Sequence, residues 1–222
     1  MATYVLIHGA SSDSCDWHRV VPLLERLGHD VVAPDLPSDD DAAGLAEYAD
    51  TVVDAIRDRR DLILVAQSMA GFTAPIVCER VPLELLVLVA AMVPRPHESP
   101  GEWWDKTGYM DARRESDARL GLPPDGEFDP VTILFHDVPE AVTVQAVRRG
   151  GRRQSDTPLL KPWPLAAWPD VPTAFMRRVV TDRLGITPDE MESGHLPALA
   201  HPTELVDRLE SYRTAGPGRV GG

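Results

Sequence analysis

Short apolar runs alternate with amphipathic stretches along the first 94 residues of the chain. Four runs show little polar alternation, which is typical of strands buried on both faces of a parallel sheet. They are residues 3–8, 30–36, 61–67 and 83–93. Between them, apolar positions recur three or four residues apart in 17–27 and 45–59, and 69–80 is small and apolar, so each stretch predicts a helix. The alternation predicts an α/β fold: a mostly parallel sheet with helices on both faces.

The pattern changes between Arg95 and about Asp170. Pro, Trp, Gly and charged residues become frequent there, and the strand-like runs disappear. The stretch is too long for a structureless loop in a compact domain, so we expect a helical cap insertion over 95–170, with its best helix over 137–149. Core-like sequence returns at Val171 and ends in a predicted helix over 203–212. The predicted organisation is a core of 1–94 and 171–215, the cap insertion, and a disordered tail over 216–222.

Composition and charge narrow the possible partners. The 222 residues are 43% hydrophobic, which is ample for one packed core. A formal net charge of −13 repels nucleic acid and anionic membranes, which favours a small-molecule substrate. No stretch approaches the ~20 apolar residues that span a bilayer, and two cysteines make no disulfide framework, so we expect a cytoplasmic monomer or homodimer. The acidic run at 39–41 is interpreted as a solvated helix start.

A serine follows the third predicted strand and directly precedes a predicted helix. In a nucleophile elbow this sharp turn exposes the serine hydroxyl, and small residues must flank it because strand and helix pass close together. Ser68 stands at this turn, with Ala66 and Ala70 where the G-x-S-x-G motif has glycines. Alanine is small enough for the packing role. The alternative interpretation is a serine that only caps the helix.

The end of the first predicted strand supports the functional interpretation of Ser68. The chain reads His8-Gly9-Ala10 there. In an enzyme with such an elbow, the loop after this strand gives one main-chain N–H to the oxyanion hole, and the residue after the nucleophile gives the other. These would be the amides of Ala10 and Met69. Gly9 would let the backbone approach the substrate closely.

His195 is the predicted base. It lies in a Gly-His pair just before the closing helix and after the serine in chain order, and imidazole is able to accept a serine proton near neutral pH. The alternative for any single histidine is a position in a surface loop. His201, which Pro202 follows, is interpreted as structural.

Three segments together resemble the α/β-hydrolase superfamily. They are VLIHGASSDSCDWHRVVPLLERLGHDVVAPDLP at 5–37, LILVAQSMAGFTAPIV at 62–77 and ESGHLPALAHPTELVDRLESY at 192–212. They look like the branch that contains plant methyl-ketone and methyl-salicylate esterases, hydroxynitrile lyases and bacterial alpha/beta fold hydrolases. The resemblance implies an α/β-hydrolase fold, with Ser68, His195 and the two main-chain amides in the roles given above. The chain has no Cys/His cluster with zinc spacing and no Gly-rich phosphate loop, so we expect no metal and no cofactor.

The acid of the triad can be aligned in two ways. The family places it after the penultimate core strand, shortly beyond a Val-Pro-Thr like the one at 171–173. In one alignment 174–180 is that strand and Asp182 is the acid, with little room before His195 for the usual helix and strand. In the other, slightly favoured alignment, 175–184 is a helix, and the strand and its acid are missing. Asp170 and Glu98 are weaker candidates from neighbouring loops.

Aromatic residues of the insertion are candidates for lining an acyl or alcohol pocket. Core packing within the cap is the alternative for each of them. The predicted substrate-binding residues are Gly9, Trp103, Trp104 and Tyr109, with Phe128 and Trp163 as further candidates.

The predicted function is a serine hydrolase that cleaves a small-molecule ester or related acyl substrate through an acyl-enzyme. A hydroxynitrile-lyase-like activity is the nearest alternative. Lyases of this branch carry Thr where Gly9 stands and Lys directly after the catalytic histidine, where this chain has Leu196. The other alternative is a ligand-binding protein that keeps the fold without the acid, which the apparent gap after Thr173 favours.

Overall fold

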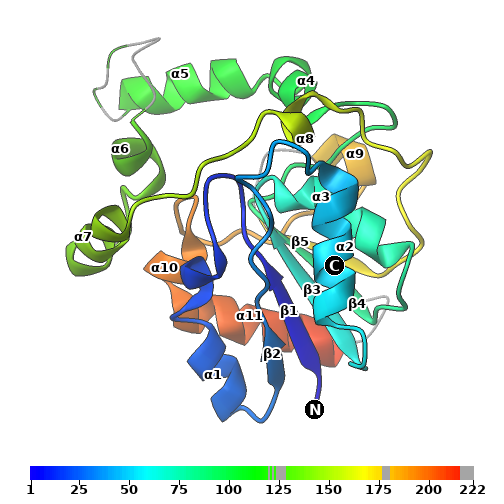
Figure 1. Ribbon diagram of the computed structural model, residues 1–222. Coiled ribbons are helices and arrows are strands. Elements are labelled where there is room, and N and C mark those ends of the chain that lie inside the picture. The colour runs from blue at the N-terminus through cyan, green and yellow to red at the C-terminus, as the bar shows by residue number, and fades with distance from the viewer. Residues whose placement is uncertain (120, 122, 124–128, 177–180, 216–222) are drawn as a thin grey trace.

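The computed structural model describes residues 1–119, 121, 123, 129–176 and 181–215. Its strands form one parallel sheet in the order β2-β1-β3-β4-β5 (Figure 1). They are β1 Thr3–Ile7, β2 Asp30–Val32, β3 Leu62–Gln67, β4 Leu85–Val89 and β5 Thr173–Met176. Leu64 of β3 pairs with Val5 on one side and with Leu86 on the other, so the loops that leave β1, β3 and β4 meet at one edge. The predicted tail lies outside the described residues.

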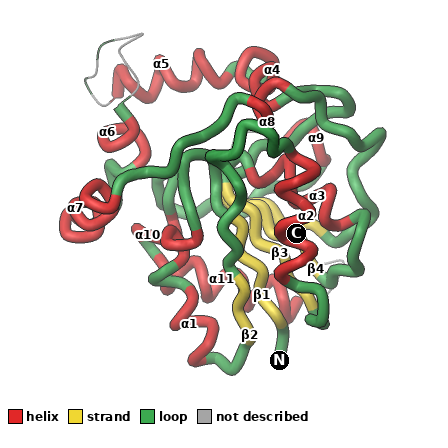
Figure 2. Tube along the Cα trace, in the orientation of Figure 1, coloured by secondary structure: helices red, strands yellow, loops and turns green. Residues whose placement is uncertain are grey.

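Helices cover both faces of the sheet, so the predicted fold class is confirmed (Figures 1 and 2). Side chains alternate along the strands: Val5 and Leu64 pack with α2 and α3, whereas Tyr4 and Ile63 pack with α1 and α11. The core helices are α1 Val21–Arg26, α2 Leu45–Ala55, α3 Ala70–Cys78, α10 Pro197–Ala200 and α11 Pro202–Ala215, with a 3-10 turn, η1, at Ser14–Trp17. No described helix is long and apolar enough to cross a membrane.

Two predicted helix starts differ from the structure. The stretch 17–27 divides into η1 and α1, and Pro22 lies in the first turn of α1, where a proline is tolerated. The acidic run at 39–41 does not begin α2, so that interpretation is wrong. The helix begins at 45, where the Glu47 carboxylate accepts a hydrogen bond from the Gly44 amide at 2.7 Å. Asp41 instead forms an ion pair with Arg153 at 2.8 Å.

The segment 95–170 forms short helices that lie over the carboxyl ends of the strands (Figure 1). They are α4 Pro100–Lys106, α5 Tyr109–Arg119, α6 Pro130–Leu134, α7 Glu140–Arg149 and α8 Thr157–Leu160. The helix expected over 137–149 is α7, which begins after Pro139. In α4, the Ser99 hydroxyl accepts from the Glu102 amide at 3.2 Å and the Glu102 carboxylate accepts from the Ser99 amide at 2.9 Å. Local capping therefore fixes where this segment becomes helical.

The chain after 171 corrects the favoured alignment. Residues 173–176 form β5, so the predicted helix over 175–184 is wrong. Phe175 and Met176 are buried beside β4, and this pairing outweighs the local helical pattern. The short helix α9, Thr181–Leu184, follows. Asp189 then pairs with Met176 in an isolated parallel bridge. The strand that we expected between the acid and His195 is reduced to this bridge.

Candidate active site

Ser68 lies in the left-handed backbone region at the turn between β3 and α3. Its φ is 55°, which residues other than glycine seldom adopt and which costs on the order of 1 kcal/mol or more. Main-chain bonds hold the turn. The Ser68 amide donates to the Val89 carbonyl at 3.3 Å, and the Ser68 carbonyl accepts from the Met92 amide at 2.9 Å. A strained strand-to-helix turn of this kind is the backbone geometry that a nucleophile elbow requires.

Two glycines make room around the elbow. A Cβ on Gly9 would lie 2.9 Å from the Cβ of Ser68, so only glycine lets the loop after β1 pass the serine this closely. A Cβ on Gly71 would overlap the main-chain carbonyl of Met92, so α3 packs against the segment after β4 only with glycine there. The close approach that motif glycines permit therefore depends on Gly71, one residue beyond Ala70.

His8 ties the loop after β1 to the loop after β2. The Leu36 amide donates to Nε2 of His8 at 3.0 Å, and Nδ1 lies 2.8 Å from the Gly9 carbonyl oxygen. Because Nε2 must accept, Nδ1 carries the proton and the ring is neutral. Burial also lowers the pKa of His8. Within the described residues, the amides of Ala10 and Met69 donate to no main-chain carbonyl; Ala10 lines the cavity beside Ser68, whereas Met69 is buried and is not part of the cavity wall.

The structure brings Ser68 and His195 to the same cavity, together with Gly9 and Ala10. His195 lies in the loop before α10. The side-chain amide of Gln67, the residue before the serine, donates to the His195 carbonyl at 3.0 Å. The elbow therefore also anchors the loop that carries the predicted base.

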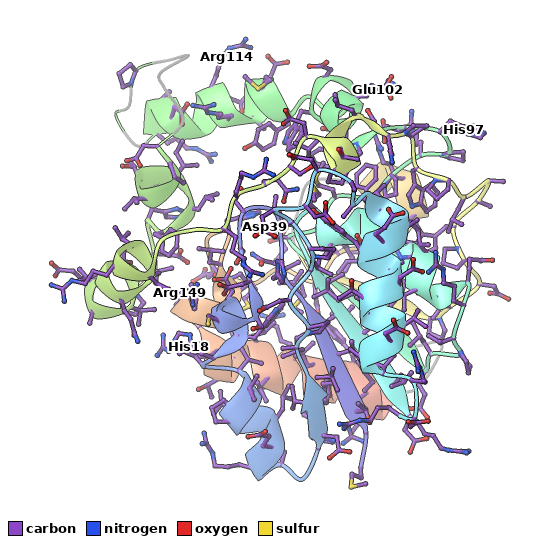
Figure 3. All side chains as sticks on the ribbon, in the orientation of Figure 1. His18, Asp39, His97, Glu102, Arg114 and Arg149 are labelled. Atoms are coloured by element: carbon purple, nitrogen blue, oxygen red, sulfur yellow. The ribbon has the colours of Figure 1, made fainter. Side chains whose placement is uncertain are left out.

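The cavity has a volume of about 320 Å³ and lies between the core and the cap. Apolar side chains from α6, α7 and the turn after α6 form much of its wall: Val131, Leu134, Phe135, Ala146 and Val147. Arg149 lies at the end of α7 (Figure 3). Its guanidinium lies 3.3 Å from Asp13 and 3.7 Å from Asp16, both of which also line the cavity. Burial raises the pKa of Asp16. The site thus combines a mainly apolar wall with one charged cluster.

The three carboxylates considered as the acid lie in different places. Asp182 belongs to α9, and its side chain is outside the described part of the structure. Glu98 is buried and paired with Arg183, whose Nη2 lies 3.1 Å from Oε1 of Glu98. Asp170 precedes β5 and therefore lies toward the amino ends of the strands, away from Ser68. Among the residues that the structure describes, no group of three His, Cys, Asp or Glu side chains could hold a metal ion.

The structure does not bring Trp103, Trp104 and Tyr109 to this cavity. Trp103 is buried, and its indole N–H donates to a main-chain carbonyl at 3.1 Å. The Tyr109 ring lies 6.4 and 6.5 Å from the two indole rings, centroid to centroid. These aromatics pack the cap against the core, so their predicted pocket role is corrected to packing. Trp163 is also buried in the core, and Phe128 lies outside the described residues.

Sequence reasoning missed Gln67, Asp137 and the charged cluster around Arg149. Gln67 occupies a variable position of the motif, and Asp137 accepts from the amide of Gly194 far along the chain, so neither has a periodic signal. Arg149, in contrast, had a signal in its charge. The basic run at 148–153 faces acidic residues of the core loops, and this charge complementarity could have indicated how the cap attaches.

The chain resembles one known family and several known proteins in sequence. A family model described as the alpha/beta hydrolase family matches residues 4–208. Methylesterase 3 of Arabidopsis thaliana is 29% identical over 124 residues, which are 50% of this chain and 47% of that protein. Norfluorocurarine synthase 1 of Strychnos nux-vomica is 28% identical over 138 residues, 57% of this chain and 52% of that protein. The chain thus spans about half the length of the curated relatives it matches.

Solved structures resemble the whole chain. An extracellular alpha/beta-hydrolase from a Paenibacillus species superposes with a TM-score of 0.74 at 18% identity, covering 99% of this chain and 100% of that one. Polyneuridine aldehyde esterase superposes with a TM-score of 0.74 at 20% identity, covering 96% of this chain and 99% of that one. At such identities the likeness shows the fold.

Proposed function

The chain belongs to the alpha/beta hydrolase family, and from that premise we propose that it is a serine carboxylesterase that cleaves a small-molecule ester. The observation that carries the proposal is the left-handed turn at Ser68, with His195 on the same cavity. Strain of this kind persists only where the surrounding structure enforces it, and it concentrates at functional sites. A serine that merely capped α3 would not need it.

In the proposed first step, Oγ of Ser68 attacks the ester carbonyl while its proton passes to the imidazole of His195. A bond forms between Oγ and the carbonyl carbon, and the carbonyl oxygen becomes an oxyanion. The amides of Ala10 and Met69 are the proposed donors to that oxygen. Each such donor is worth roughly 10²–10³ in rate in a comparable site.

In the second step, the ester C–O bond breaks and the leaving alcohol takes the proton from His195, which leaves an acyl-enzyme on Ser68. Water then attacks the acyl group with His195 again as base, the bond between the carbonyl carbon and Oγ breaks, Oγ takes the proton back from His195, and the acid product leaves. A carboxylate that orients the imidazole raises the rate by on the order of 10⁴ in other triads. We keep Asp182 as the proposed acid.

The wall of the cavity suggests the substrate class. Apolar side chains from α6 and α7 favour an uncharged, largely apolar acyl or alcohol group, and the volume of about 320 Å³ favours a small one. A methylesterase stands among the relatives, so methyl esters of small carboxylic acids are the first substrates to test.

The test is labelling by a fluorophosphonate probe, which forms a covalent bond with an activated serine. We expect Ser68 to be labelled in the folded protein, and Ser68→Ala to abolish labelling and to lower kcat on esters by on the order of 10⁶. Ser12→Ala is the matched control, because Ser12 also lines the cavity but donates its hydroxyl to Asp16. Mass spectrometry of the labelled peptide identifies the modified residue.

Three outcomes would contradict the proposal. Cleavage of a cyanohydrin without turnover of any ester would favour the lyase. A folded wild type that takes no label and turns over neither substrate, yet binds small apolar molecules, would favour the non-catalytic ligand-binding protein. Labelling at a serine other than residue 68 would refute the assignment of the nucleophile.

A further inference from the structure

We infer that Asp137, in the cap between α6 and α7, is a positioning residue for His195. The inference rests on the proposed function, because it assigns Asp137 a part in holding the base of that site. The expected orienting carboxylate comes from the core after β5, whereas Asp137 comes from the cap. The cap would then help to assemble the catalytic groups as well as enclose the substrate.

The Asp137 carboxylate is bonded to the loop that carries His195 at two points. Its Oδ2 accepts hydrogen bonds from the Gly194 amide and from the Ser193 hydroxyl, the latter at 3.2 Å. Nε2 of His201 lies 3.8 Å from the same oxygen, an ion pair when that ring is protonated. Hydrogen bonds to a carboxylate are about twice as strong as neutral ones. The contact therefore fixes the main chain directly before the imidazole.

Gly194 admits this carboxylate only because it lacks a side chain. A Cβ at Gly194 would lie 2.7 Å from Cγ of Asp137 and 2.8 Å from Cε1 of His136. The other carboxylate oxygen, Oδ1, is buried and has no hydrogen-bond partner within the described residues. A buried carboxylate oxygen without a partner lowers stability, and such an atom in a native protein requires a reason. Fixing the loop that carries the base is such a reason.

Gln67 and Asp137 hold two consecutive residues from two parts of the molecule. Gln67, next to the nucleophile in the core, donates to the His195 carbonyl at 3.0 Å, and Asp137 in the cap accepts from the Gly194 amide.

The experiment compares Asp137→Ala, Asp137→Asn and Glu140→Ala in ester turnover and in the rate of fluorophosphonate labelling. We expect Asp137→Ala to lower kcat and the labelling rate about 10- to 100-fold, because a small displacement of a catalytic group has that effect. KM should change much less. Asp137→Asn should recover part of the loss, because an amide oxygen still accepts from Gly194. Glu140→Ala, an exposed carboxylate in the first turn of α7, should match the wild type.

A double-mutant cycle tests whether Asp137 acts through Gly194. Gly194→Ala displaces the same carboxylate, so the double variant should be no slower than the slower single variant. An unchanged kcat in Asp137→Ala, a change in KM alone, or an equal loss in Glu140→Ala would each overturn the inference. If Asp137→Ala does not fold, Asp137→Asn decides, with its melting temperature as the check.

Failure of the proposed function has a different signature. A wild type that neither labels nor cleaves esters removes the enzyme and this role together. An active wild type with an equally active Asp137→Ala removes the role alone.

Discussion

The site has an elbow half, around Ser68 and the loop after β1, and a cap half, formed by α6, α7 and the residues that follow α7. Different interactions predominate in holding each half in place. The elbow half is fixed by main-chain hydrogen bonds at Ser68 and by the absence of side chains at Gly9 and Gly71. The cap half is attached mostly through side chains, with Arg149 3.3 Å from Asp13 and further ion pairs from 152 and 153, and with only two main-chain hydrogen bonds, from 152 to 11 at 3.2 Å and from 155 to 38 at 2.7 Å, among the described residues there. Ion pairs near the surface contribute about 0–1 kcal/mol each and weaken with salt, and the pairs of Arg149, whose acidic partners are partly buried, are the least exposed of this set.

In the proposed function, the elbow half carries the groups that react and the cap half carries the wall that fits the substrate. The proposed nucleophile Ser68 lies on backbone that cannot shift without breaking its hydrogen bonds to the end of β4 and to the segment that follows it. The apolar wall proposed to meet the rest of the substrate lies on α6 and α7, which are held by side-chain packing against Leu196 and Leu199 and by the ion pairs of Arg149. Asp137 is an exception, because it links the cap half to the loop of the base.

The largest expected effect is on the elbow half. Gly9→Ala places a Cβ 2.9 Å from the Cβ of Ser68, so the loop after β1 must move and carry the Ala10 amide with it. We expect kcat on esters to fall by about 10²–10³, the usual effect of losing one oxyanion donor. Gly101→Ala, in helix α4, is the control. An unimpaired Gly9→Ala would show that the two halves do not differ as described.

An intermediate effect is expected from the cap half. Arg149→Ala removes the pairs to Asp13 and Asp16, so KM should rise a few-fold with kcat nearly unchanged, in line with the ~1 kcal/mol of an ion pair that remains partly exposed at the arginine. Added salt should raise KM of the wild type but not that of the variant. The neighbouring Arg148→Ala is the control. A large loss of kcat would mean that this pair, too, positions catalytic groups.

The smallest expected effect is on the pH dependence of stability, through His8 in the elbow half. Burial holds the pKa of His8 below 6.5, so the unfolded chain binds a proton that the folded chain excludes once the pH falls below about 6.5. Stability from this group is complete above that pH and declines below it. Between about pH 7.5 and pH 5.5, the melting temperature of the wild type should fall more than that of His8→Asn. His18→Asn, at an exposed ring, should follow the wild type.

The elbow half could be predicted because its signals are local. The apolar runs, Gly9 and Ser68 each stand within a few residues of the backbone feature they cause. The cap half could not be predicted as well. Aromatic composition does not distinguish a pocket wall from packing, so Trp103 and Tyr109 were predicted to line the pocket although they pack the cap. Asp137 contacts Gly194 across 57 residues of chain, and no local pattern indicates such a contact.

The region of the acid shows a third limit. Arg177 and Arg178 make 175–184 look helical, and only pairing with β4 reveals that Phe175 and Met176 belong to a strand. Tertiary burial overrides local preference in such short segments.

The sheet ends at both sides in very short strands. β2 has three residues, and β5 has four before the isolated bridge at Asp189. An outer strand of this length presents few unpaired N–H and C=O groups, so it is a poor template for another chain. Along the described residues of both margins, a second copy would find little backbone to pair with, so a dimer of this protein is expected to form through helices or loops.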